Sequence, residues 1–499
     1  MRRSGMLLPI ASLPSSYGIG AFSKEAYEFI DLLNETDQRL WQILPMGPTS
    51  YGDSPYQSFS TFAGNPYFID LDELVQKGWI RKEECDCRDW GNNPSYIDYG
   101  KIYESRYAVL RIAFERSGIR EQEAFQEFCR KNSSWLEDFA LFMAVKDKFN
   151  GKSWLEWEED IRLRKPEALA SYRAQLDWEI CFYKFLQFEF FEQWEKVRAY
   201  AKEKNIKFVG DIPIYVALDS ADTWANPELF QLNEDNLPTG VAGCPPDGFS
   251  ATGQLWGNPL YRWEYHKKTG FQWWIERIRH CFEMYDIVRI DHFRGFDEYY
   301  SIPYGDETAV NGHWEKGPGI ELFKVLNETL GEKEIIAEDL GFLTESVYEL
   351  LEESGYPGMK VLQFAFDPSE NSVYLPHKYP RNCVVYTGTH DNDTTVGWLR
   401  SMPDWDKEVA IRYMNDYHTP EESRFWDVIV LAMSSVADTC IIPVQDYLGL
   451  GSEARINTPS TLGDNWKWRM SPYAFSDGLK DGIRRITKLY GRKEERKEK

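Results

Sequence analysis

The feature that most constrains the fold is a repeated alternation of short apolar segments with amphipathic helical segments. Eight apolar segments lie at residues 6–10, 39–45, 207–214, 287–292, 334–340, 359–366, 382–391 and 440–448. Near-continuous apolar runs of this length are typical of parallel strands buried on both faces. Helical patterns separate most of them, at 22–34, 182–204, 271–282, 320–330 and 344–354. The alternation predicts an α/β fold, a (β/α)8 TIM barrel, with a doubly wound open sheet as the alternative.

The spacing between the predicted strands is uneven and indicates insertions. The second and third strands are separated by roughly 160 residues, whereas a βα unit needs only about 30. We therefore predict a mostly helical subdomain inserted after the second strand, over about 66–166, with helices at 99–117, 121–131 and 133–148. A second insertion is predicted over about 215–285, and its segment 244–259, rich in Pro and Gly, is expected to form an ordered, irregular loop over the open end of the barrel.

The segment after the eighth predicted strand is short. About 50 residues remain there, whereas a further β-sandwich takes about 100. We expect one barrel over 1–499 with largely helical insertions and without a C-terminal β-domain.

Charge and composition exclude several classes of protein. The net charge is −23, so the chain lacks the excess of basic residues that nucleic-acid binding needs. No run of 18 apolar residues is present, so we expect no membrane partner and no membrane span. Eight scattered cysteines without a CxxC pair, and no segment typical of a signal peptide, predict a cytoplasmic location.

Carboxylates follow four of the predicted strands, at the end where barrel enzymes carry their active sites. They are Asp211, Asp291, Glu338 and Asp391. Because side chains alternate along a strand, Arg289 and Asp291 are expected to face the same way. A neighbouring guanidinium would keep Asp291 ionised and able to act as a nucleophile.

Glu338 is expected on the strand next to Asp291. Neighbouring strands lie about 4.8 Å apart, which allows the carboxyl separation of about 5–5.5 Å found in retaining glycosidases. Glu338 would then be the general acid and base, with its pKa raised by the nearby charge of Asp291. Asp391 would stabilise positive charge at the anomeric carbon, and His292 and His390 would donate hydrogen bonds to the sugar ring.

Each of these residues also has a purely structural interpretation. A single Asp or Glu at a strand end often caps a loop or helix, and Arg289 with Asp291 could form a structural ion pair. A metal site is disfavoured because the seven histidines are scattered and no HExxH motif occurs. Neither GxGxxG nor a Walker A motif is present, so no cofactor is expected.

At these segments the sequence resembles the 4-alpha-glucanotransferases of the amylomaltase or disproportionating-enzyme type, glycoside hydrolase family 77 of the α-amylase clan. The resemblance extends from about Ser12 to Arg469. The motifs that carry it are Asp53-Ser54-Pro55-Tyr56-Gln57, Gly210-Asp211-Ile212-Pro213, Arg289-Ile290-Asp291-His292, Ala337-Glu338-Asp339-Leu340-Gly341, Thr389-His390-Asp391-Asn392-Asp393, Asn457-Thr458-Pro459 and Asn465-Trp466.

The resemblance implies roles for particular residues. It implies Asp291 as nucleophile, Glu338 as general acid and base, and Asp391 as stabiliser of the transition state. The residues implied around the donor sugar are Tyr56, Asp211, Arg289 and His390. Gln254 and Trp256 are implied on the acceptor side, and Asn465 in the sugar-binding cleft.

The resemblance also implies a reaction. Segments of maltooligosaccharides or amylose would pass to the 4-hydroxyl of another glucan or of glucose, by a retaining double displacement without a cofactor. An α-amylase-type hydrolase, with the same triad and water as acceptor, stays open, as does a non-catalytic glucan-binding protein. Aromatic residues expected to stack on sugars include Tyr51, Phe249, Trp466 and Trp468.

Overall fold

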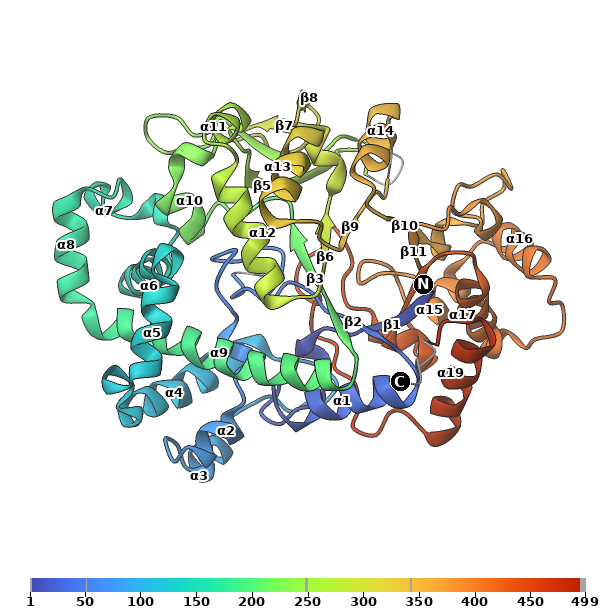
Figure 1. Cartoon of the computed structure of the whole chain (residues 1–499), viewed down its shortest axis with the longest axis horizontal. Coiled ribbons are helices and arrows are strands. Elements are labelled where there is room, and N and C mark those ends of the chain that lie inside the picture. Colours follow the sequence, from blue (N-terminus) through green and yellow to red (C-terminus); the bar gives the residue numbers. More distant parts are fainter. Residues whose placement is uncertain (1, 51, 247–249, 342, 494–499) are drawn as a thin grey trace.

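Eight parallel strands form a nearly closed barrel in this computed structural model, which describes residues 2–50, 52–246, 250–341 and 343–493 (Figure 1). The strands are β1 (Arg3–Leu7), β2 (Leu40–Gln42), β3 (Lys207–Pro213), β6 (Ile287–Asp291), β9 (Ile335–Ala337), β10 (Gly358–Val361), β11 (Cys383–Tyr386) and β12 (Thr439–Pro443). Each strand pairs with its neighbour in chain order except β9 and β10, which form the seam, and β12 pairs with β1. At the seam, the Ala337 N–H donates to the Pro357 carbonyl at 3.0 Å. The barrel is confirmed, since a doubly wound sheet would reverse its strand order.

The first strand begins earlier than the sequence predicted. Arg3 and Ser4 extend β1 because they pair with Thr439 and Cys440 of β12. This pairing joins opposite ends of the chain, so no local apolar pattern marks it.

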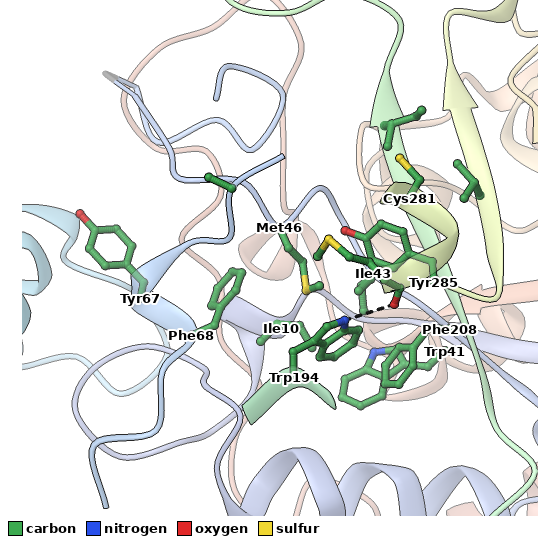
Figure 2. Close-up of a cluster of buried hydrophobic side chains, with 14 of the residues drawn as sticks. Ile10, Trp41, Ile43, Met46, Tyr67, Phe68, Trp194, Phe208, Cys281 and Tyr285 are labelled. Carbon is green, nitrogen blue, oxygen red and sulfur yellow. Dashed lines mark hydrogen bonds between the residues drawn. The ribbon is translucent and has the colours of Figure 1, made fainter. Parts of the chain in front are cut away.

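Side chains of the barrel strands alternate between two cores. One cluster takes residues from all eight strands and fills the barrel interior: Leu7, Leu40, Val209, Ile287, Ile336, Met359, Val361, Val384, Tyr386 and Ile441. The alternate residues pack outward against helices. Figure 2 shows Trp41 and Phe208 of the barrel wall beside Trp194 of α9 (Asp177–Glu203), with the Phe208 ring 5.1 Å from Trp41 and 4.6 Å from Trp194.

Helices surround this barrel. Along its outside, α19 (Asp477–Leu489) contacts α1 (Lys24–Glu35), which contacts α9, and α12 (Gln272–Met284) contacts α13 (Ile320–Leu330), which contacts α14 (Glu345–Ser354). The C-terminal half of the chain also contains α15 (Thr395–Ser401), α16 (Asp404–Met414), α17 (Arg424–Ser434) and α18 (Val444–Tyr447). Among the described helices, none has both the length and the apolar character needed to cross a bilayer.

The chain between β2 and β3 is helical and lies to one side of the barrel, at the left of Figure 1. It contains α2 (Leu71–Gln76), α3 (Lys82–Asp86), α4 (Tyr99–Ser117), α5 (Glu123–Lys131), α6 (Ser133–Lys148), α7 (Glu159–Arg162) and α8 (Pro166–Gln175). The helices α4 and α6 have the bounds that the sequence predicted.

A four-stranded antiparallel sheet was not predicted. It consists of β4 (Gly240–Cys244), β5 (Gln254–Pro259), β7 (Glu298–Pro303) and β8 (His313–Lys316), in the order β5-β4-β7-β8. In the chain, α10 (Ala221–Ala225) precedes β4 and α11 (Trp263–Lys268) follows β5. The prediction of an irregular loop over 244–259 was therefore wrong for β5. Leu255 lies opposite Gly243, where an added Cβ would come within 2.1 Å of the Gln254 carbonyl oxygen. Gly243, directly before the predicted loop, therefore permits close strand pairing.

Candidate active site

The strand register places an arginine between two carboxylates at the carboxyl end of the barrel. Asp211 on β3 lies directly opposite Arg289 on β6, on the face that carries the interior residues Val209 and Ile287. Arg289 Nη1 donates to both oxygens of Asp211 at 2.7 Å, and Nη2 lies 3.0 Å from Asp291 Oδ1. The predicted shared face of Arg289 and Asp291 is confirmed. Asp211 is fully buried, whereas the side chain of Asp291 remains 29% exposed and is reachable from solvent.

Glu338 lies beside Asp291 because β9 pairs with β6. Ile290 is opposite Ala337, and the Glu338 N–H donates to the Ile290 carbonyl at 3.0 Å. Its carboxylate accepts the backbone N–H of His292 at 2.7 Å and that of Leu340 at 2.8 Å. The left-handed backbone of His292 (φ 54°) turns the chain at the end of β6, where its N–H meets this carboxylate.

The environments of the two carboxyls separate their pKa values. Burial raises the pKa of Glu338 to about 8, and the charge of Asp291 adds to the rise while Arg289 opposes it. Burial also raises the pKa of Asp291, to about 6, against the lowering effect of the Arg289 charge. Glu338 therefore keeps its proton to higher pH than Asp291, which is the order that a general acid and a nucleophile require.

Asp391 is held by residues that follow β12. Asn457 Nδ2 donates to Asp391 Oδ1 at 2.7 Å, and Arg455 Nη2 donates to the Asp391 carbonyl at 2.7 Å. His390 Nε2 lies 3.4 Å from the same Oδ1. Asn457 belongs to one of the sequence motifs, but that motif indicated no role for it. Its presence in that motif was the sequence feature that could have marked it as a site residue.

Aromatic rings form one wall beside Asp211. The Tyr56 hydroxyl donates to Asp211 Oδ2 at 2.7 Å, and its ring stacks on His390 with centroids 5.2 Å apart. Trp466 approaches both rings, at 5.8 and 6.0 Å. Burial, with the charge of Asp211, raises the pKa of the Tyr56 hydroxyl well above its ordinary value, so this hydroxyl stays protonated and donates.

On the opposite side, β5 brings Trp256 against His292. Their rings meet edge to face at 4.8 Å, and the Trp256 indole N–H donates to Gln254 Oε1 at 3.1 Å. Burial, followed by the charge of Arg294, lowers the pKa of His292 to about 3, so its ring is neutral. Within the described residues, His292 Nε2 is buried without a hydrogen-bond partner.

Other residues singled out from the sequence are placed differently. The amide of Asn465 accepts from the Thr458 N–H at 2.9 Å and donates to the Thr461 carbonyl at 3.0 Å, so it organises its own loop. Trp468 is 5% exposed and belongs to the core. Tyr51 and Phe249 lie outside the described residues.

A group of acidic residues with metal-ligand spacing lies away from these carboxylates. In the described part of the chain, Glu73 of α2 with Glu189 and Glu192 of α9 forms the one such group. Lys77 Nζ lies 3.4, 2.7 and 2.8 Å from these three carboxylates, respectively. An ammonium group thus already contacts all three carboxylates of this cluster.

A barrel with two carboxyl groups at neighbouring strand ends has the arrangement typical of glycosidase-type enzymes. The family model for glycoside hydrolase family 77, described as 4-alpha-glucanotransferase, matches residues 8–475. A 4-alpha-glucanotransferase of Clostridium butyricum is 52% identical, over 97% of this chain and 99% of that protein. A 4-alpha-glucanotransferase of Thermus thermophilus is 48% identical, over 94% of this chain and 95% of that protein. The solved amylomaltase of Streptococcus agalactiae in complex with acarbose superimposes with a TM-score of 0.96, at 42% identity over 99% and 100% of the two chains. The chain belongs to glycoside hydrolase family 77, and its activity is the transfer of α-1,4-glucan segments.

Proposed function

We propose that this enzyme acts by double displacement, with Asp291 as nucleophile and Glu338 as general acid and base. Glu338 protonates the glycosidic oxygen while Asp291 attacks the anomeric carbon, and the reducing-end fragment leaves. The 4-hydroxyl of an acceptor glucan then attacks the covalent intermediate and gives its proton to Glu338. Two inversions retain the α-1,4 linkage. The observation that supports this proposal most directly is the contact of 3.0 Å between Arg289 Nη2 and Asp291 Oδ1. The arginine charge favours the ionised form of Asp291, while Glu338, with the higher pKa, keeps its proton.

Asp391 is proposed to stabilise the positive charge that develops on the sugar ring. Its carboxylate needs a defined orientation to do so, and the Asn457 amide supplies it through a hydrogen bond of 2.7 Å. His390, stacked on Tyr56, is proposed to donate to a hydroxyl of the same ring.

We propose that the substrates are maltooligosaccharides and amylose as donors, and glucans or glucose as acceptors. Tyr56, Asp211 and Arg289 would surround the donor sugar, since they form one hydrogen-bonded group next to Asp291. The acceptor would lie against the group formed by Gln254, Trp256 and His292. Asn465 would contribute indirectly, through the loop that it organises.

Exclusion of water separates transfer from hydrolysis. We propose that two insertions, at about 66–166 and 215–285, flank the cleft, and that Trp256 on β5 shields the intermediate while the acceptor position is empty. The cytoplasmic location stays a prediction.

Incubation of the purified protein with maltotriose alone tests this function. We expect glucose and a ladder of longer oligosaccharides with a constant number of reducing ends, and no such ladder from Asp291→Asn. Rising reducing ends without longer products would mean hydrolysis instead. A parallel sample with a chelator should react at the same rate, because no step uses a metal or cofactor. A loss of activity there would contradict that expectation.

A further inference from the structure

A second cavity lies between the inserted helices and the barrel, apart from the catalytic carboxyls. It encloses about 210 Å³ and is lined by residues from the start of α6, from α10 and the residue that follows it, and from α12. These helices are neighbours in Figure 1, and α6 contacts α10. The cavity shares Ser60 and His280 with a smaller one of about 50 Å³ that reaches Tyr56 and Asp211. The outer cavity is thus next to the donor side of the active site without containing any of its residues.

Two half-buried tryptophans line this cavity. Trp135 of α6 stacks on Phe62 at 6.3 Å with an angle of 16°, and Trp273 of α12 meets Phe62 edge-on at 6.3 Å and 90°. The two indole planes therefore stand at a steep angle to each other around one space. Neither indole N–H donates to another side chain or carbonyl within the described residues. Indole faces pack well against the apolar CH faces of a pyranose, and their N–H groups can donate to its hydroxyls.

A buried histidine offers a hydrogen-bond acceptor to the same space. His280 is 8% exposed, and its Nε2–H donates to the Phe62 carbonyl at 2.8 Å. Burial lowers the pKa of His280 to about 4, so the ring is neutral and Nδ1 is an acceptor. Among the described residues, the hydrogen bond to Phe62 is the one that the His280 ring makes, which leaves Nδ1 for a ligand. The first turn of α6 adds backbone N–H donors, since no side chain caps it.

Three of the charged residues that line the cavity form ion pairs. Asp138 binds Arg164 at 2.8 Å, and Glu276 binds Arg279 at 2.5 Å. The rest of the lining combines two indole rings and polar groups with charged side chains of both signs, Lys131, Asp222 and Glu283. Such a mixture fits an uncharged polyhydroxyl ring, which can donate and accept hydrogen bonds, better than an ion of one sign.

We propose that this cavity is a second glucan-binding site that holds one glucosyl unit of an α-1,4-glucan. The proposal rests on the proposed function for its ligand class and extends it to a site outside the catalytic cleft. A long chain anchored there has a higher local concentration at the active site, whereas a trisaccharide occupying the cleft gains nothing from the second anchor. The site should therefore affect long glucans and leave short ones unchanged.

Two variants and one matched control test this proposal. Trp273→Ala removes one aromatic face. Ser134→Arg fills the cavity from the exposed first turn of α6 and leaves both indoles in place. Trp405→Ala removes a tryptophan of α16 that is 59% exposed and does not line the cavity. Each is made in the full chain, alone and together with Asp291→Asn, which blocks turnover during binding measurements.

Retention in gels containing soluble amylose measures binding without catalysis, and initial rates on amylose and on maltotriose measure the consequence. We expect Trp273→Ala and Ser134→Arg to weaken retention and raise the KM for amylose by about tenfold, through loss of the second anchor. Their kinetics on maltotriose should stay within about twofold of the parent, as should all values for Trp405→Ala.

The second site would be overturned if both variants had the same retention and KM as the control. If Trp273→Ala does not fold, the same result in Ser134→Arg alone would overturn it. Equal losses on maltotriose and amylose would also overturn it, because they would indicate a defect of the catalytic cleft. Absence of transfer from maltotriose in the parent protein would instead contradict the proposed function. The two failures are therefore distinguishable.

Discussion

Replacing Arg289 by methionine should reduce both the stability of the barrel and its activity. The guanidinium is 3% exposed and contacts both oxygens of Asp211 at 2.7 Å, and Asp211 is itself fully buried. Removing one partner of a buried pair leaves an uncompensated charge, which costs about 3–5 kcal/mol of unfolding free energy. That is a large part of the roughly 5–15 kcal/mol by which a folded domain is stable.

Activity should fall for a separate reason. Arg289 opposes the rise that burial causes in the pKa of Asp291, so its loss favours the protonated nucleophile. The lost contact of 3.0 Å is a hydrogen bond between charged groups, worth about 1.5–3 kcal/mol, or a rate about 10- to 100-fold lower.

The double variant Asp211→Asn with Arg289→Met separates the two effects. It leaves no unpaired charge at this position, so most of the stability should return. Activity should not return, because Asp291 still lacks its arginine.

Urea unfolding followed by tryptophan fluorescence gives the midpoints for the parent, both single variants and the double variant, and maltotriose transfer gives the rates. An Arg289→Met midpoint equal to that of the parent would refute the buried-charge reasoning, as would a double variant no more stable than Arg289→Met. Recovery of activity in the double variant would refute the proposed action of Arg289 on Asp291.

Three further predictions concern the site. Asn457→Ala should lower kcat on maltotriose about 10- to 100-fold by freeing the carboxylate of Asp391, whereas Asn465→Ala, which loosens only its own loop, should have a smaller effect; equal effects would contradict this assignment. The melting temperature of Glu338→Gln, measured relative to that of the parent protein, should increase as pH rises. Folding raises the pKa of Glu338 from 4.5 to about 8, so the stability that its proton contributes is complete below 4.5 and is lost as pH rises towards 8. A difference in melting temperature that stays constant across that window would disprove the raised pKa. Trp256→Ala should increase hydrolysis relative to transfer, measured as reducing ends released per longer oligosaccharide formed, and an unchanged ratio would remove this residue from the shielding argument.

Local patterns in the sequence were sufficient for most of the barrel. Buried parallel strands are continuous apolar runs, and surface helices repeat their apolar residues at helical spacing, so both can be recognised within a short window. Alternation along β6 was also enough to place Arg289 and Asp291 on one face, since a strand has a fixed period of two. The residues that we propose for the chemistry could therefore be named before the fold was known.

Pairings between distant segments were decided only by the tertiary structure. The Tyr56 hydroxyl reaches Asp211 across 155 residues, and Asn457 reaches Asp391 across 66. The antiparallel sheet was missed for the same reason, because β4 pairs with the distant β7. Asn465 differs, since its contacts with Thr458 and Thr461 are local and its motif did not indicate them. A hydrogen bond depends on where two groups lie in space, and a local pattern contains no information about which distant group will be there. The sequence therefore determined which elements form and which residues can react, and the packing of those elements decided which side chains orient them.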